Sequence, residues 1–132
     1  MGFFVSNFKW LMLFSGLLTC TMFLGLAAPA RSLEMNFGEA MPTAPAAEIL
    51  VRNWSALIGL IGVMLIYGAF EPAVRKFALV IAGVSKVIFI ALMIAYGRQY
   101  FGFGAGTAVI ADSVMVILYA AYFFFAHGPE IR

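Results

Sequence analysis

The sequence contains very few of the residues that build catalytic or metal sites. Among its 132 residues there is one cysteine, Cys20, and one histidine, His127. A lone cysteine forms no disulfide within the chain, and a single histidine assembles neither a Ser/His/Asp set nor a metal-binding pair. We therefore expect a protein that is not an enzyme on its own and has no metal or other cofactor. A cofactor supplied by a partner chain stays open.

Charged residues are also scarce. They make up 11% of the chain, whereas globular domains have about 25%. The net charge of +2 is small and dispersed, which excludes a nucleic-acid-binding surface. Because 64% of the residues are hydrophobic, a soluble protein of this composition would lack polar residues to cover its surface. The composition indicates an integral membrane protein whose main partner is the lipid bilayer.

Four apolar runs approach or exceed the length of about 20 residues that crosses a bilayer. The first run has about 19 residues, more than the 7–15 of a cleaved signal core, so we expect it to remain as a membrane helix. The predicted helices are Trp10–Ala28, Ala46–Phe70, Pro72–Tyr96 and Ala105–Ala126. We therefore predict an all-α fold, a single domain over residues 1–132 that forms an antiparallel bundle of four transmembrane helices.

The longest polar connection is the outer loop, residues 29–45. It contains Pro42, Pro45 and the acidic Glu34 and Glu39, while its apolar residues are spaced irregularly. This pattern leaves two alternatives open, a short helix at the membrane interface and a solvated loop.

Loop charges indicate the orientation of the chain in the membrane. The tight basic turn at Arg75 and Lys76 lies on the side of the termini, and Glu34, Glu39 and Glu48 lie on the other side. Basic residues are enriched in cytoplasmic loops. We therefore expect both termini in the cytoplasm, and a bacterial inner membrane as the location.

Two formal charges stand inside apolar runs, Lys86 in the third and Asp112 in the fourth. Each costs about 2.5–3.5 kcal/mol at the centre of a membrane helix, so each needs a partner or a water-filled cavity. In antiparallel neighbours, Lys86 lies about 15 Å and Asp112 about 10 Å below the shared end of the helices. A lysine side chain spans this offset. An ion pair would fix the helix register or take part in binding or proton movement; alternatively, Lys86 extends to the membrane surface without touching Asp112.

Small residues at helical spacing indicate where the helices approach each other closely. They are Ala82 and Gly83 beside Lys86, Ala105 and Ala108 beside Asp112, and Ser55, Gly59 and Gly62 on the second helix. Such stripes serve packing within the bundle or contacts between chains.

The layout resembles the small DoxX-like superfamily of bacterial four-helix membrane proteins. One helix is followed by a longer outer loop with proline and acidic residues, and then by three helices in quick succession. The most similar stretch, Arg52 to Gly97, reads RNWSALIGLIGVMLIYGAF, EPAVRKF and ALVIAGVSKVIFIALMIAYG. The resemblance implies the four-helix fold. Some members are subunits of quinone-linked oxidoreductases, but this sequence has no signature that would transfer a redox role.

Three functions fit these observations. The first is a non-catalytic membrane protein that acts as a homo-oligomer or as an accessory subunit of a larger complex. The second is a small transporter or channel for ions or protons, gated by ionisation of Lys86 and Asp112, which requires a polar cavity that reaches both residues. The third is a quinone- or lipid-binding subunit, which requires an apolar cleft that opens sideways to the bilayer.

Overall fold

The computed structural model describes residues 6–125, and they contain four helices long and apolar enough to cross a membrane. These spans are Phe8–Ala27, Pro45–Phe70, Pro72–Tyr96 and Gly104–Phe125. No strand occurs within the described range, so the predicted all-α membrane bundle is confirmed. The predicted helix end at Ala126 and the terminal His127 lie outside the described residues.

The first span is built from three consecutive helical pieces. They are α2 (Phe8–Cys20), the short 3₁₀ turn η1 (Thr21–Phe23) and α3 (Leu24–Ala27). The span ends at Ala28, whose φ of −134° and ψ of 71° lie outside the helical region. The chain therefore changes direction before the outer connection begins.

The outer connection contains a short helix, α4 (Pro29–Phe37). Pro29 occupies the first turn of the helix. Backbone N–H groups in the first turn have no partner within the helix, so the N–H that proline lacks is not needed there. Gly38 ends the helix with a left-handed φ of 67°, a conformation that glycine adopts without steric cost. Of the two alternatives that the sequence left open for residues 29–45, the structure thus has the helix, followed by an irregular stretch.

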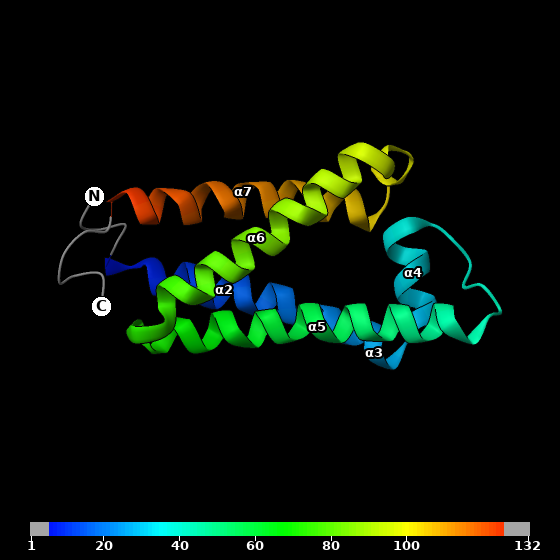
Figure 1. Cartoon of the computed structure of the whole chain (residues 1–132), viewed down its shortest axis with the longest axis horizontal. Coiled ribbons are helices and arrows are strands. Elements are labelled where there is room, and N and C mark those ends of the chain that lie inside the picture. Colours follow the sequence, from blue (N-terminus) through cyan, green and yellow to red (C-terminus); the bar gives the residue numbers. More distant parts are fainter. Residues whose placement is uncertain (1–5, 126–132) are drawn as a thin grey trace.

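Two long helices follow, α5 (Pro45–Phe70) and α6 (Pro72–Tyr96), and each starts with a proline in its first turn. The short turn η2 (Arg98–Tyr100) then leads to α7 (Gly104–Phe125). Figure 1 shows that the start of α2, the α5–α6 turn and the end of α7 lie at one end of the bundle, called here the terminal end. Helix α4 and η2 lie at the opposite end, called the loop end.

The four spans pack in a ring in the order α2, α5, α6, α7. Contacts connect α2 with α5, α5 with α6, and α6 with α7, and the ring closes where Phe8 of α2 stacks on Tyr122 of α7 at 4.2 Å between centroids. The terminal-end core consists of Phe8, Met12, Leu65, Ala69, Ala78, Leu79, Ala82, Met115, Tyr119 and Tyr122. Large apolar residues such as Leu57, Val84 and Ile117 are exposed on the outside, as expected of surfaces that face lipid.

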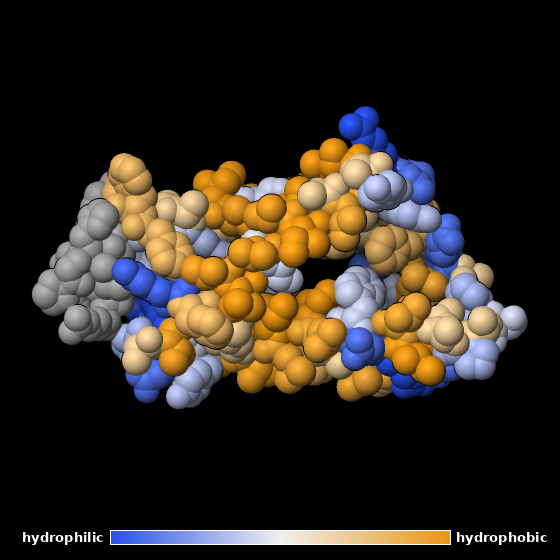
Figure 2. Space-filling view, viewed as in Figure 1, coloured by the Kyte–Doolittle hydropathy of each residue, from blue (hydrophilic) through white to orange (hydrophobic). Residues whose placement is uncertain are grey.

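Helix α6 is inclined to α5, so the two helices separate toward the loop end (Figure 1). Helix α4 lies at this end, beside the separated helices. A second, smaller cluster of buried residues, Met93, Ala105 and Val109, fills the space between α6 and α7 there. The middle of the bundle, between the two clusters, is less tightly filled, and Figure 2 shows a hollow between α5 and α6 on this face.

Candidate functional site

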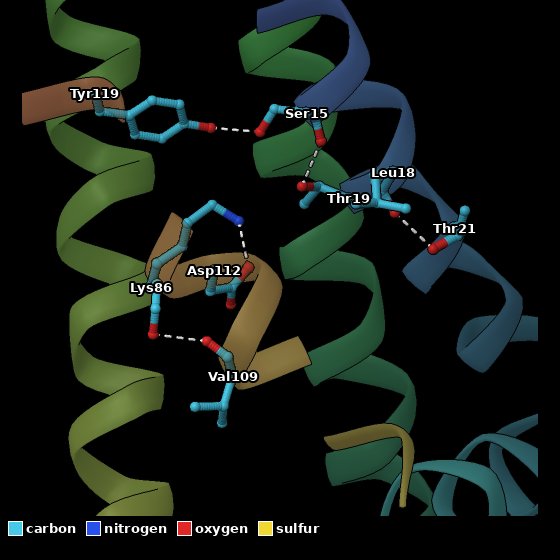
Figure 3. A network of polar contacts seen from close by, with 9 residues as sticks. Ser15, Leu18, Thr19, Thr21, Lys86, Val109, Asp112 and Tyr119 are labelled. Carbon is cyan, nitrogen blue, oxygen red and sulfur yellow. Dashed lines mark hydrogen bonds and ion pairs between the residues drawn. The ribbon is translucent and has the colours of Figure 1, made fainter. Parts of the chain in front are cut away.

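The two charged side chains of the membrane spans meet between α6 and α7. Lys86 Nζ donates a hydrogen bond to Asp112 Oδ1 at 2.8 Å, and Figure 3 shows the two side chains pointing toward each other. The Lys86 side chain is 9% exposed and the Asp112 side chain 22%. The structure therefore has an ion pair inside the bundle, with the carboxylate as the more open group.

Small residues surround this ion pair on both helices. On α6, Ala82 is fully buried one turn before the lysine, and a Cβ on Gly83 would stand 3.8 Å from the Tyr119 ring. On α7, Ala105 is buried, and Ala108 lines the cavity described below. The small side chains leave space beside the two charges.

The small residues Ser55, Gly59 and Gly62 of α5 face the first span of the same chain. A Cβ on Gly62 would lie 2.7 Å from the backbone oxygen of Gly16, and one on Gly59 would lie 2.6 Å from the Phe23 ring. Ser55 is fully buried, and its Oγ has no hydrogen-bond partner among the described residues. The first span therefore covers this stripe, which is not a free surface for a second chain.

A cavity of about 310 Å³ reaches both members of the ion pair. This volume is at the lower end of small-molecule pockets, which span about 300–1,000 Å³. The polar side chains in its wall are Ser15, Thr19, Thr21, Asn36, Ser85, Lys86, Thr107 and Asp112. The apolar part of the wall includes Met22, Phe37, Trp54, Ile58, Phe89 and Met115. Such a wall suits a small molecule with one polar end and an apolar body.

Toward the terminal end, a pair of hydroxyl groups closes the cavity. Ser15 Oγ of α2 is hydrogen-bonded to Tyr119 Oη of α7, and both residues are buried (Figure 3). Thr19, one turn along α2, donates its hydroxyl to the Ser15 carbonyl at 2.7 Å. Beyond this level lies the terminal-end core, where Phe8 and Tyr122 stack. The cavity thus ends on packed side chains and is not a continuous pore through the described part of the bundle.

Toward the loop end, α4 borders the cavity. Asn36 and Phe37 of α4 both line it, and Asn36 Nδ2 donates to the Ser32 carbonyl at 2.9 Å. Helix α4 is held against α7 by a close contact, because a Cβ on Gly104 would lie 2.9 Å from Asn36 Oδ1 and 3.0 Å from the Met35 carbonyl oxygen. The position of this short helix determines how far the cavity is covered.

The ion pair retains capacity for further hydrogen bonds. The contact uses one of the three ammonium hydrogens of Lys86 and one of the two carboxylate oxygens of Asp112. A ligand can therefore donate to the carboxylate and accept from the ammonium without separating them. No group of three or more His, Cys, Asp or Glu residues that would suit a metal ion is found in residues 6–125.

Sequence reasoning did not find several of these residues. Ser15 and Tyr119, which close the cavity, and Phe89, which lines it, received no role. A signal was present: Ser15 and Thr19 are polar residues one turn apart in an apolar helix, and Tyr119 is two turns from Asp112 on α7. Polar residues that share a face of a membrane helix mark the interior of a bundle.

Comparison of the chain with protein-family models, with curated proteins and with solved structures gives no match, so the DoxX-like resemblance stays a prediction.

Proposed function

We propose that this integral membrane protein binds a small uncharged molecule inside its bundle, through hydrogen bonds to Lys86 and Asp112. The observation that carries the proposal is that one cavity wall contains both members of the ion pair. A pair that only fixed helix register would be expected in dry packing. Here, space remains beside the two groups, and both have hydrogen-bonding capacity left.

The electrostatics of the cavity favour an uncharged ligand. Lys86 and Asp112 are the two residues with ionisable side chains among those that line the cavity in the described chain, and their charges balance. A charged ligand would add a net charge at low dielectric, where an uncompensated ion is expensive. A hydroxyl, carbonyl or amide group bonds to both partners without that cost.

A closed end favours binding over conduction. The Ser15–Tyr119 hydrogen bond and the terminal-end core separate the cavity from that end of the bundle. A transport role would therefore require a second conformation in which Ser15 and Tyr119 part. Transport coupled to the ion pair is an extension of the proposed binding step rather than its rival.

The role as an accessory subunit or homo-oligomer stays a prediction that is compatible with binding. One of its supports, the stripe of Ser55, Gly59 and Gly62, is accounted for by packing within the chain. The bacterial inner membrane as the location, with both termini in the cytoplasm, is likewise proposed from the basic turn at Arg75 and Lys76.

Three short probes that each have six carbon atoms but different head groups test the proposal: 1-hexanol, hexanoate and hexylamine. Thermal unfolding in mild detergent is followed with each probe, because a ligand that binds only the folded state raises the midpoint. We expect hexanol to raise the midpoint more than the two charged probes do.

A matched pair of variants distinguishes binding in the cavity from general effects of the probes on thermal unfolding. Ala108→Leu fills the cavity, whereas Ala120→Leu adds the same side chain at an exposed position of the same helix. The hexanol effect should be lost in Ala108→Leu and kept in Ala120→Leu. Equal effects of all three probes, or an unchanged hexanol effect in Ala108→Leu, would exclude the proposed site.

A further inference from the structure

A second, apolar groove lies between α4, α5 and α6 at the loop end. Its volume is about 410 Å³. The residues that line it include Leu33, Leu50, Val51, Leu92, Met93 and Tyr96, and none of its lining residues is formally charged. The groove therefore offers van der Waals contacts along its length and suits an apolar chain.

The groove opens on the outside of the bundle. Leu50, Leu92 and Tyr96 are exposed on the outside of the bundle, on two helices that are both apolar enough to span the membrane. The space lies where α5 and α6 separate toward the loop end (Figure 1). An apolar chain dissolved in the bilayer can enter it without crossing water.

Three aromatic side chains form a shared wall between the groove and the cavity. Phe37, Trp54 and Phe89 line both spaces. The Phe37 and Trp54 rings are 6.0 Å apart between centroids and tilted by 48°, and they come from two different helices, α4 and α5. The two spaces therefore adjoin each other across these three rings.

The two spaces also lie at the right separation for one amphiphile. Lys86, in the cavity, and Met93, in the groove, are seven residues apart on α6, which corresponds to about 10 Å of helix rise. A polar head at the ion pair would therefore place the following methylene groups at the aromatic wall and the remaining tail in the groove.

We propose that the cavity and the groove form one site for an uncharged single-chain amphiphile, which enters sideways from the bilayer between α5 and α6. This inference rests on the proposed function and adds the ligand class and the route to it. The polar head leaves the bilayer for the hydrogen-bonding groups around Lys86 and Asp112. The tail passes from lipid into an apolar groove, so its environment stays apolar throughout.

Tryptophan fluorescence gives a direct test, because the chain has only two tryptophans. Trp54 lines both spaces, whereas Trp10 is 55% exposed on the first span. Trp10→Phe leaves Trp54 as the reporter, and Trp54→Phe leaves Trp10 as a reporter of the bulk bilayer. The probe is 1-(9,10-dibromostearoyl)glycerol, an uncharged amphiphile with a quenching bromine pair, added to phosphatidylcholine vesicles that contain the protein.

We expect Trp54 to be quenched saturably at low mole fractions of this probe, and Trp10 only in proportion to the probe in the bilayer. The anion 9,10-dibromostearate has the same tail and should bind at least about tenfold more weakly. Quenching of Trp54 that rises linearly, as for Trp10, would show contact with bulk lipid only and would overturn the proposal.

A second pair of variants tests the route, in the background that keeps only Trp54. Val51→Phe narrows the groove, whereas Leu57→Phe adds a ring on the exposed face of the same helix, away from both spaces. Saturable quenching should weaken about tenfold in Val51→Phe and persist in Leu57→Phe. Saturable quenching that Val51→Phe leaves unchanged would overturn the route through the groove.

The hexanol experiment distinguishes this inference from the function on which it rests. A hexanol effect that Ala108→Leu removes, together with linear quenching of Trp54, would leave the cavity site standing and reject the amphiphile. Failure of both experiments would reject the cavity site as well.

Discussion

Gly16 and Gly62 bring the backbones of α2 and α5 into direct contact. A Cβ on Gly16 would lie 2.8 Å from the Gly62 carbonyl oxygen, and a Cβ on Gly62 would lie 2.7 Å from the Gly16 carbonyl oxygen and 2.7 Å from the Cys20 amide nitrogen. The neighbouring atoms belong to the backbone and cannot rotate away. In lipid, such close approach is a main source of helix association, because hydrophobic driving force between the spans is missing.

The first prediction is that Gly62→Ala destabilises the bundle. Overpacking against a backbone costs about 1–3 kcal/mol, which outweighs the gain of up to about 1 kcal/mol from replacing glycine by alanine within a helix. Gly83→Ala is the matched control, because its Cβ would meet nothing closer than 3.8 Å. Thermal unfolding in mild detergent should show a lower midpoint for Gly62→Ala and an equal or higher one for Gly83→Ala. An unchanged midpoint for Gly62→Ala would contradict the close contact.

The second prediction concerns Arg75, which fastens the α5–α6 turn. Its buried guanidinium donates from Nε to the Gly68 carbonyl at 3.0 Å and from Nη2 to the Ala69 carbonyl at 2.8 Å. These carbonyls belong to the last turn of α5, where a cation is also favoured by the helix dipole. Hydrogen bonds to a charged group contribute about 1.5–3 kcal/mol, so Arg75→Met should lower the free energy of unfolding by about that amount.

The adjacent Lys76 provides the control for that substitution. Lys76 is exposed, and Lys76→Met removes the same formal charge from the same turn. If Arg75 acts through its two hydrogen bonds, Arg75→Met should lower the unfolding midpoint clearly more than Lys76→Met does. Similar losses in both variants would mean that the net charge at this end, and not the capping of α5 by Arg75, determines the loss of stability.

Most of the fold could be predicted from the sequence because the bilayer restricts the alternatives. An apolar run of about 20 residues must satisfy its own backbone in lipid, so it forms a helix. Pro45 and Pro72 indicate where two of these helices begin. Helix α4 could not be settled in this way, because it mixes polar and apolar residues and contains no long apolar run. It depends on Gly38 at its end and on the contact of Asn36 with Gly104, which links parts of the chain that are far apart in sequence.

The site was only partly predictable. The contact of Lys86 with Asp112 follows from the cost of leaving either charge alone in a membrane span. The cavity beside them does not follow from any single helix. It arises because α6 separates from α5 toward the loop end, and because side chains from five helices leave a space at one level. The residue pattern of one helix does not predict how its neighbouring helix is inclined, and it does not predict the volume that remains between the two helices.

The third prediction concerns the hydroxyl pair that closes the cavity. Ser15→Ala leaves the buried Tyr119 hydroxyl without its partner, at a cost of about 1–3 kcal/mol. Tyr119→Phe should cost less, because the Ser15 hydroxyl can instead bond to a carbonyl one turn earlier in its own helix. Chemical denaturation in detergent measures both free energies of unfolding. A larger loss for Tyr119→Phe would show that the tyrosine hydroxyl makes a further stabilising contact besides the one to Ser15.

The fourth prediction is that Lys86 and Asp112 are energetically coupled. Lys86→Met leaves the carboxylate without its partner, and Asp112→Asn leaves the ammonium likewise. Breaking a buried pair costs about 3–5 kcal/mol, whereas removing both charges is often close to neutral. Because both groups border the cavity and the Asp112 side chain is 22% exposed, neither group is completely desolvated, and we expect losses at the lower end of that range.

A double-mutant cycle on the free energy of unfolding measures this coupling. The double variant Lys86→Met/Asp112→Asn should lose less free energy of unfolding than the two single variants lose together. If the single losses instead add up to the loss of the double variant within about 0.5 kcal/mol, the pair is not coupled. The same double variant also separates the two roles of the pair. If the ion pair only fixes helix register, a stably folded double variant keeps the response to hexanol. If the charges bind the polar head, as we propose, the variant stays folded but responds to hexanol no more strongly than Ala108→Leu.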